Sequence, residues 1–186
     1  MYEIIELTLE QSGAYKSIKP MLDGNIFHVT PQHNLASILH DRGICPNDSG
    51  NLEGAFGNYK KSYARVRSRV SLFDFHNPPE SKIEEHIYKC LPIRDASADM
   101  PLAILLLTEA YWSSVIPYSS AEFDANLDQQ VVPYVEATYP GTIPLEAIER
   151  IIKVTFIEDT NSVANILKGK KGAKPFFVDN FTRPGN

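Results

Sequence analysis

The chain contains 186 residues, of which 43% are hydrophobic, and this length and composition predict one domain over residues 1–186. Its formal net charge of -5 argues against a protein that coats nucleic acid or an anionic membrane through its overall field. The longest apolar run, PLAILLL, is about a third of the length of a membrane-spanning helix. The acidic N-terminal segment lacks the basic start and apolar run of a signal peptide, so we expect a cytoplasmic protein with no membrane partner.

Two strands are the first predicted elements. Residues 2–10 are expected to form an edge strand, and the sequence NIFHVT predicts a short strand that ends at Thr30. In that strand Ile26, His28 and Thr30 share one face, because successive side chains of a strand alternate. Thr30 before Pro31 is also typical of a helix start, with a capping hydroxyl followed by proline at the first helical position.

A helix and a loop are predicted next. Leu35, Ile38 and Leu39 recur at helical spacing, and Gly43 is expected to end the helix in the left-handed conformation. Residues 47–62 contain three glycines and little periodicity. This composition predicts a mobile loop that could fold over a ligand.

The segment YARVRSRVSLFDF predicts a strand with a basic first half. If the whole run is extended, one face carries Arg65, Arg67, Arg69, Ser71, Phe73 and Phe75. Lys60 and Lys61 extend the arginines into a run of cations without an acid among them. Such a cluster suits the phosphate of a nucleotide or a nucleic-acid backbone, because guanidinium groups match phosphate oxygens bidentately. A solvated strand face or loop explains the pattern equally well.

The remaining elements complete an α+β chain. They are a helix from about residue 77 to 91, a strand covered on both faces at 102–108, a strand at VVPYVEATYP, a short helix from Pro144, a strand at 153–157, a helix near 162–167 and a final strand at PFFVD. Strands dominate without a regular alternation of strands and helices. The predicted fold class is therefore α+β with a mixed or largely antiparallel sheet.

His28 and Glu136 are the first candidate site residues. His28 lies at the mouth of its strand beside Thr30, where it can hydrogen-bond a ligand, although a partly buried histidine bonded to backbone gives the same pattern. An acid in mid-strand, such as Glu136, either faces solvent or works in a cleft. Tyr134 and Thr138 on the same predicted face favour a polar cleft with an aromatic wall.

Several common site patterns are absent from the sequence. It contains no GxGxxG after a strand, no GxxxxGK, no HExxH and no GxSxG, which disfavours Rossmann and hydrolase functions. Cys45 and Cys90 are far apart and have no CxxC or CxxH neighbour, so neither a zinc site nor a disulfide framework is expected. No metal site is predicted.

The order of the motifs resembles a known family. FHVTPQHNLASILHDRGI is similar to the opening of the ADP-ribosyltransferase fold in DarT-type DNA ADP-ribosyltransferase toxins and tRNA 2'-phosphotransferases: a strand ending in HxT, a helix of the form NLxSIL, then glycine and an apolar residue. RVSLFDF resembles the second core strand, and YVEATYPGTIPLEAIERIIKV resembles the later strand that bears the catalytic glutamate. The resemblance covers about residues 26–157. It implies an ADP-ribosyltransferase-like split sheet, mixed or antiparallel, with short flanking helices.

The resemblance implies roles in binding NAD, the co-substrate of such enzymes. His28 and Thr30 would contact a ribose of NAD, and Ser71 in the second core strand would lie beside the nicotinamide. Glu136 would be the catalytic glutamate, which bonds the ribose 2'-OH and stabilises the positive charge that develops as nicotinamide leaves. A carboxylate fixed near such a charge is most effective in a water-poor cleft.

The resemblance also implies an aromatic contact and an acceptor. Phe73 or Tyr134 would stack on the nicotinamide, and Arg65, Arg67 or Arg69 would take the pyrophosphate or assist the acceptor. Members that modify protein often carry an acid or glutamine where this chain has Tyr134, so DNA or RNA is the expected acceptor. The implied function is a toxin or defence enzyme, with an antitoxin or immunity protein as partner. The alternative is a degenerate domain of the same fold that binds a nucleotide or a protein without chemistry.

Overall fold

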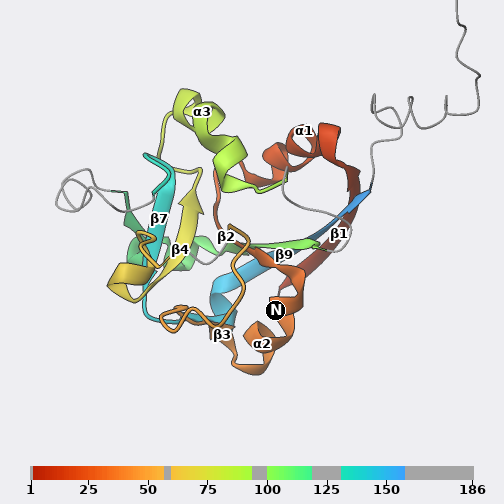
Figure 1. Cartoon of the computed structure of the whole chain (residues 1–186). Helices are drawn as coiled ribbons and strands as arrows, with labels where there is room; N and C mark the ends of the chain where they lie inside the picture. Colours follow the sequence, from red (N-terminus) through yellow and green to blue (C-terminus); the bar gives the residue numbers. More distant parts are fainter. Residues whose placement is uncertain (1, 57–59, 94–99, 119–130, 158–186) are drawn as a thin grey trace, which may run out of the picture.

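The computed structural model describes residues 2–56, 60–93, 100–118 and 131–157 (Figure 1). The elements are β1 (Glu3–Glu10), α1 (Gln11–Leu22), β2 (Ile26–Pro31), η1 (Gln32–Asn34), α2 (Leu35–His40), β3 (Gly43–Ile44), η2 (Arg65–Arg67), β4 (Arg69–Asp74), α3 (Glu80–Cys90), β5 (Leu102–Leu107), η3 (Glu109–Ser114), β6 (Ile116–Pro117), β7 (Glu136–Pro140), β8 (Ile143–Pro144), η4 (Leu145–Ala147) and β9 (Ile148–Ile157), where η marks a 3-10 helix. The helix predicted near 162–167 and the strand predicted at PFFVD lie outside the described residues.

Seven strands form one sheet in the order β1-β9-β5-β2-β4-β7-β6, and β3 pairs with β8 separately. β1 and β9 run parallel, whereas the other neighbouring strands of the sheet run antiparallel. The predicted α+β class with a mixed, mostly antiparallel sheet and short helices is therefore confirmed. Within the described ranges, no helix has the length and apolar character needed to cross a membrane.

The strand β5 is the centre of the core. All six of its residues are buried, as expected for the apolar run LAILLL between two antiparallel neighbours, β2 and β9. Leu102, Ile104 and Leu106 face one apolar cluster, and the residues between them face another. The prediction of a strand covered on both sides is correct.

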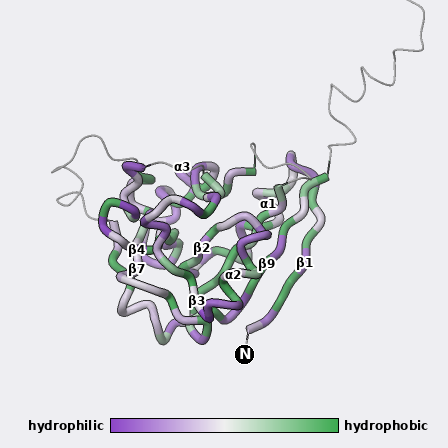
Figure 2. Tube along the Cα trace, turned by 60° about the horizontal axis from the view of Figure 1, so that its bottom comes forward, coloured by the Kyte–Doolittle hydropathy of each residue, from purple (hydrophilic) through white to green (hydrophobic). Residues whose placement is uncertain are grey.

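Helices α1 and α3 cover one face of the sheet, and α2 packs with β3 and β8 against the other (Figure 1). In Figure 2 hydrophobic colour follows mainly the strands, whereas α3 carries largely hydrophilic residues. α1 is absent from the elements that the sequence predicts. It nevertheless buries Ala14, Ile18 and Leu22, which lie four residues apart on one helical face.

The sheet opens between β2 and β4. These strands pair at two positions only, Ile26 with Asp74 and Phe27 with Phe73. Beyond Phe27, β2 stays paired with β5, while β4 stays paired with β7 along five positions. The strands β2 and β4 consequently leave a gap in the backbone ladder. By alternation from Phe27, Val29 lies on the sheet face of Phe73 and Glu136, whereas His28 and Thr30 lie on the opposite face.

The predicted helix start at Thr30 is wrong. Thr30 and Pro31 still pair with β5, and the chain enters a 3-10 turn at Gln32 before α2 begins. The helix stop predicted at Gly43 is also wrong, because the left-handed residue is Arg42, with φ of 56°. Gly43 has a different role: a Cβ atom there would lie 2.6 Å from the carbonyl oxygen of Ile143, so only glycine permits the close pairing of β3 and β8.

The prediction that Arg65, Arg67 and Arg69 share one face of an extended strand is also wrong. Residues 65–67 form a 3-10 turn, Ser68 has a left-handed φ of 50°, and β4 begins only at Arg69. Arg65 and Arg67 therefore do not share a strand face with Ser71. The strand predicted at VVPYVEATYP also starts later, at Glu136, because Tyr134 lies in a turn with φ of 67°.

Candidate active site

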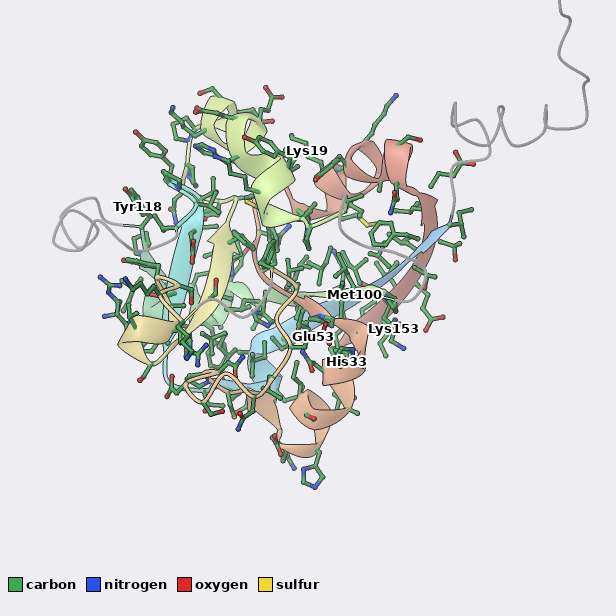
Figure 3. The ribbon with its side chains drawn as sticks, in the orientation of Figure 1. Lys19, His33, Glu53, Met100, Tyr118 and Lys153 are labelled. Carbon is green, nitrogen blue, oxygen red and sulfur yellow. The ribbon has the colours of Figure 1, made fainter. Side chains whose placement is uncertain are left out.

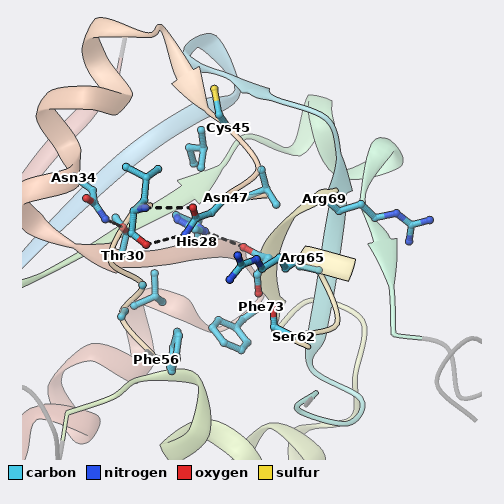
Figure 4. A pocket seen from close by; sticks show the side chains of 18 of the residues that line it. His28, Thr30, Asn34, Cys45, Asn47, Phe56, Ser62, Arg65, Arg69 and Phe73 are labelled. Atoms are coloured by element: carbon cyan, nitrogen blue, oxygen red, sulfur yellow. Dashed lines mark hydrogen bonds between the residues drawn. The ribbon is translucent and has the colours of Figure 1, made fainter. Parts of the chain in front are cut away.

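The gap between β2 and β4 holds a cavity of about 330 Å³, a size typical of small-molecule sites (Figure 4). Seven of the predicted site residues line it: His28 and Thr30 from β2, Arg65 from η2, Arg69, Ser71 and Phe73 from β4, and Glu136 from β7. Antiparallel pairing sets Glu136 opposite Phe73, which brings the third strand to the same opening. The structure thus collects residues that are more than 100 positions apart in the sequence.

The carboxylate of Glu136 is nearly fully enclosed, with 7% of the residue exposed. Its Oε2 accepts a hydrogen bond of 2.8 Å from the backbone N–H of Val132, and its Oε1 accepts one of 3.4 Å from the Ser71 hydroxyl. Burial raises the pKa of Glu136 from 4.5 to about 7, although both hydrogen bonds act in the opposite direction. Near neutral pH this carboxyl group can therefore both accept and release a proton.

The imidazole of His28 is fixed by the neighbouring strand. Its Nδ1 lies 2.8 Å from the backbone oxygen of Ser71. A carbonyl oxygen only accepts, so Nδ1 carries the hydrogen, and Nε2 of the neutral ring is an acceptor. Burial lowers the pKa of His28, which keeps the ring neutral at physiological pH.

Thr30 is buried at the end of β2 and lines the same cavity. Its Oγ1 accepts a hydrogen bond of 2.9 Å from the Nδ2 of Asn34 in η1. The same Nδ2 donates to the backbone oxygen of Glu53, at 2.8 Å. Asn34 is a site residue that sequence reasoning missed, although it stands in the quoted motif NLxSIL.

Aromatic rings form the apolar wall of the cavity. The rings of Phe73 and Phe56 meet edge to face, with centroids 5.5 Å apart. Phe27 lies behind Phe73 at 5.8 Å. Phe56 belongs to the glycine-rich loop that the sequence predicted could fold over a ligand, and Asn47 and the segment from Leu52 to Phe56 do line the cavity.

The arginines point in different directions. Figure 4 shows the Arg65 side chain directed toward His28, whereas the Arg69 guanidinium points away from the cavity. Arg69 donates from Nη1 to the Thr138 hydroxyl at 3.4 Å. Arg67 stacks over the Tyr63 ring at 4.2 Å and is not among the described residues that line the cavity. Arg65 and Arg69 both contribute to the cavity lining, and of the two Arg65 directs its guanidinium toward the interior.

Tyr134 lies outside the cavity lining. The residue is 52% exposed, and its ring stacks on His86 of α3 with centroids 6.3 Å apart and lies under Lys82 at 4.8 Å. The left-handed turn at Tyr134 removes it from the face that Glu136 occupies. Phe73, together with Phe56, is therefore the aromatic residue available to a ligand in the cavity.

No family model, curated protein or solved structure matches this chain. Across the described ranges, no group of three or more histidine, cysteine, aspartate or glutamate residues could hold a metal ion. The function is argued below from the cavity and its side chains.

Proposed function

We propose that the chain is an NAD-dependent ADP-ribosyltransferase with the split sheet of that fold. The observation that carries the proposal is the position of Glu136: a buried carboxyl group with a pKa of about 7 faces the cavity at the gap between β2 and β4. Burial of a carboxylate costs free energy whatever its role, so an acid kept in a cavity with a strongly shifted pKa favours a functional role. The cavity, the aromatic wall and the neutral His28 around it favour a catalytic task over a structural one.

The hydrogen-bonding groups suit a ribose. The Nε2 of His28 and the carboxylate of Glu136 are acceptors, and both require hydroxyl donors from a ligand. The hydroxyl of Thr30 accepts from Asn34, so its own hydrogen is available as a donor. A ribose carries neighbouring hydroxyls that donate and accept, which matches this set. Phe73 and Phe56 add an apolar wall for a flat ring, and Arg65 adds a charge for phosphate.

Glu136 is the proposed catalytic residue. Bound NAD would supply an ADP-ribosyl group, as the bond from ribose C1' to the nicotinamide nitrogen breaks and an acceptor bonds to C1' with loss of a proton. Glu136 would accept a hydrogen bond from the ribose 2'-OH and stabilise the developing positive charge, an effect that the dry surroundings strengthen. Ser71 holds the Oε1 of Glu136, and the Val132 N–H holds its Oε2, so the carboxylate is fixed before the ligand binds.

Nucleic acid is the proposed acceptor. Residues 60–69 carry two lysines and three arginines and no acid, in an otherwise acidic chain. Such a basic segment beside the cavity suits the phosphates of DNA or RNA. A cytoplasmic toxin or defence enzyme of this type would also have an antitoxin or immunity protein as partner.

The first experiment measures NAD consumption by the wild type and by Glu136→Ala, Glu136→Gln and Glu149→Ala, with DNA, RNA and protein offered as acceptors. Glu149 is an exposed glutamate of β9 and serves as the matched control. We expect both Glu136 variants to lose about 10²–10³-fold in turnover and Glu149→Ala to stay within about twofold. Unchanged turnover in Glu136→Ala would sink the proposal. NAD binding by the wild type, seen as a raised melting temperature without turnover, would instead support the degenerate binding domain.

A further inference from the structure

The carboxamide of Asn34 joins two walls of the cavity. Its Nδ2 donates to the Thr30 hydroxyl oxygen at 2.9 Å and to the Glu53 backbone oxygen at 2.8 Å. An amide nitrogen carries two hydrogens, so both are used. One bond reaches the end of β2, and the other reaches the loop that faces it.

The bond to Thr30 determines how this hydroxyl meets a ligand. Because Oγ1 accepts from Asn34, the hydroxyl hydrogen is left to donate elsewhere. Thr30 lines the cavity beside His28, whose Nε2 is an acceptor. Asn34 therefore fixes a donor next to an acceptor at the place where a ligand hydroxyl would bind.

The bond to Glu53 connects β2 to the wall formed by residues 52–56, all of which line the cavity. Asn47 holds the start of this wall separately, through two hydrogen bonds to the backbone of Leu52. This wall ends in Phe56, which packs on Phe73. His33, the neighbour of Asn34, also approaches the Glu53 carboxylate at 3.5 Å (Figure 3), but both of these side chains are more than half exposed. Exposed ion pairs contribute little to stability. The Asn34 bond to Glu53 is exposed as well, but Asn34 also makes a part-buried bond to Thr30 and so links the wall to β2.

We propose that Asn34 is a positioning residue for ligand binding: it holds the 52–56 wall against β2 and directs the Thr30 hydroxyl into the cavity. The part concerning NAD rests on the proposed function, whereas the connection between Asn34 and the wall does not. Because Asn34 does not hydrogen-bond Glu136 in the described structure, its loss weakens ligand binding and leaves the chemical step unchanged.

The wall is tested without ligand, by backbone ¹⁵N order parameters. In Asn34→Asp, which keeps the size and removes both donors, we expect the order parameters of residues 52–56 to fall from about 0.85 to below about 0.6. Asn34→Ala gives a second measurement if the aspartate variant does not fold. His33→Ala is the matched control and should leave the values unchanged. Unchanged order parameters in both Asn34 variants would overturn the proposal, even if the chain consumes no NAD.

A second experiment tests ligand binding. It measures steady-state NAD turnover in the same variants and in Thr30→Val. We expect the KM for NAD to rise about tenfold in Asn34→Ala with kcat within about twofold, which corresponds to one hydrogen bond of about 1.4 kcal/mol. In the double variant with Thr30→Val, the rise in KM should be smaller than the product of the two single effects, since they share one bond. A fall in kcat at unchanged KM, or fully multiplicative effects, would overturn the link through Thr30. Absence of NAD binding in the wild type would refute the proposed function but not the connection to the wall.

Discussion

The two halves of the sheet are built on opposite principles. In the half formed by β1, β9 and β5, the strands pair along their lengths and β5 buries apolar side chains on both faces. In the half formed by β2, β4 and β7, pairing across the β2–β4 boundary stops after two positions, and Thr30, Glu136 and Thr138 are buried. Burial of polar groups costs free energy, whereas burial of leucine supplies it. The first half stabilises the fold, and the second half uses part of that stability to hold a site.

In the half of the sheet formed by β1, β9 and β5, the largest predicted effect of a substitution is a loss of stability. Leu105 is fully buried in β5, and Leu105→Ala should lower the free energy of unfolding by about 3 kcal/mol through lost burial and a cavity. Urea denaturation measures this change, and Leu39→Ala on the exposed side of α2 should stay within about 0.5 kcal/mol. A loss below about 1 kcal/mol for Leu105→Ala would contradict the division between the two halves.

In the half formed by β2, β4 and β7, removing the charge of the Glu136 carboxylate should stabilise the protein. The pKa of Glu136 is raised from 4.5 to about 7, so between these pH values the folded protein binds a proton that the unfolded chain has released. The contribution of protonated Glu136 to the stability of the folded protein is fully present below pH 4.5 and is lost as the pH rises through 7. At 1.36 kcal/mol for each pKa unit, the charged carboxylate costs about 3 kcal/mol at pH 8.

Glu136→Gln should therefore be more stable than the wild type at pH 8 by up to about 3 kcal/mol, and the difference should vanish near pH 4.5. Glutamine keeps the size of the side chain and can still accept from the Val132 N–H. Denaturation at the two pH values measures the difference, with Glu149→Gln as an exposed control. Equal stabilities of Glu136→Gln and the wild type at pH 8 would show that the carboxylate is not desolvated as described.

The smallest predicted effect concerns Ser71. Its hydroxyl lowers the pKa of Glu136 through a long bond of 3.4 Å. Ser71→Ala should therefore raise that pKa and move the midpoint of the pH profile of NAD turnover upward from about 7, by less than about one pH unit. The profile of kcat/KM against pH measures the displacement, and Ser17→Ala on α1 is the control. A midpoint that moves downward would contradict the assigned direction of this hydrogen bond.

Local patterns in the sequence predict much of the sheet but little of its irregular parts. Alternation correctly places His28 and Thr30 on one face, because each lies in a regular strand. The same rule fails for Arg65 and Arg67, since the left-handed Ser68 breaks the run in a way that alternation does not reveal. Helix α1 is missed because its sequence contains Gly13 and Pro20, both poor helix formers, and its burial depends on the sheet beneath it.

Individual residues of the candidate site could be predicted from the sequence, but their meeting in one cavity could not. His28, Ser71 and Glu136 lie on three strands, and the register that sets Glu136 opposite Phe73 arises from tertiary pairing. The turn that removes Tyr134 from the cavity depends on contacts with α3. Asn34 is recognisable only once the loop at Glu53 is seen to lie over it.

The parallel pairing of β1 with β9 also sets the order of events in biosynthesis. Glu3 bonds Arg150 across 147 positions of the chain, so β1 has no partner until β9 has been made. At synthesis rates of about 5–20 residues per second, this delay lasts roughly 7 to 30 s. During that time neither side of β1 is paired, and its outer side remains an edge of the finished sheet that other chains can join. The negative charges of Glu3, Glu6 and Glu10 oppose such association before β9 is made. Glu3 and Glu6 then form ion pairs with Arg150 and Lys153 of β9.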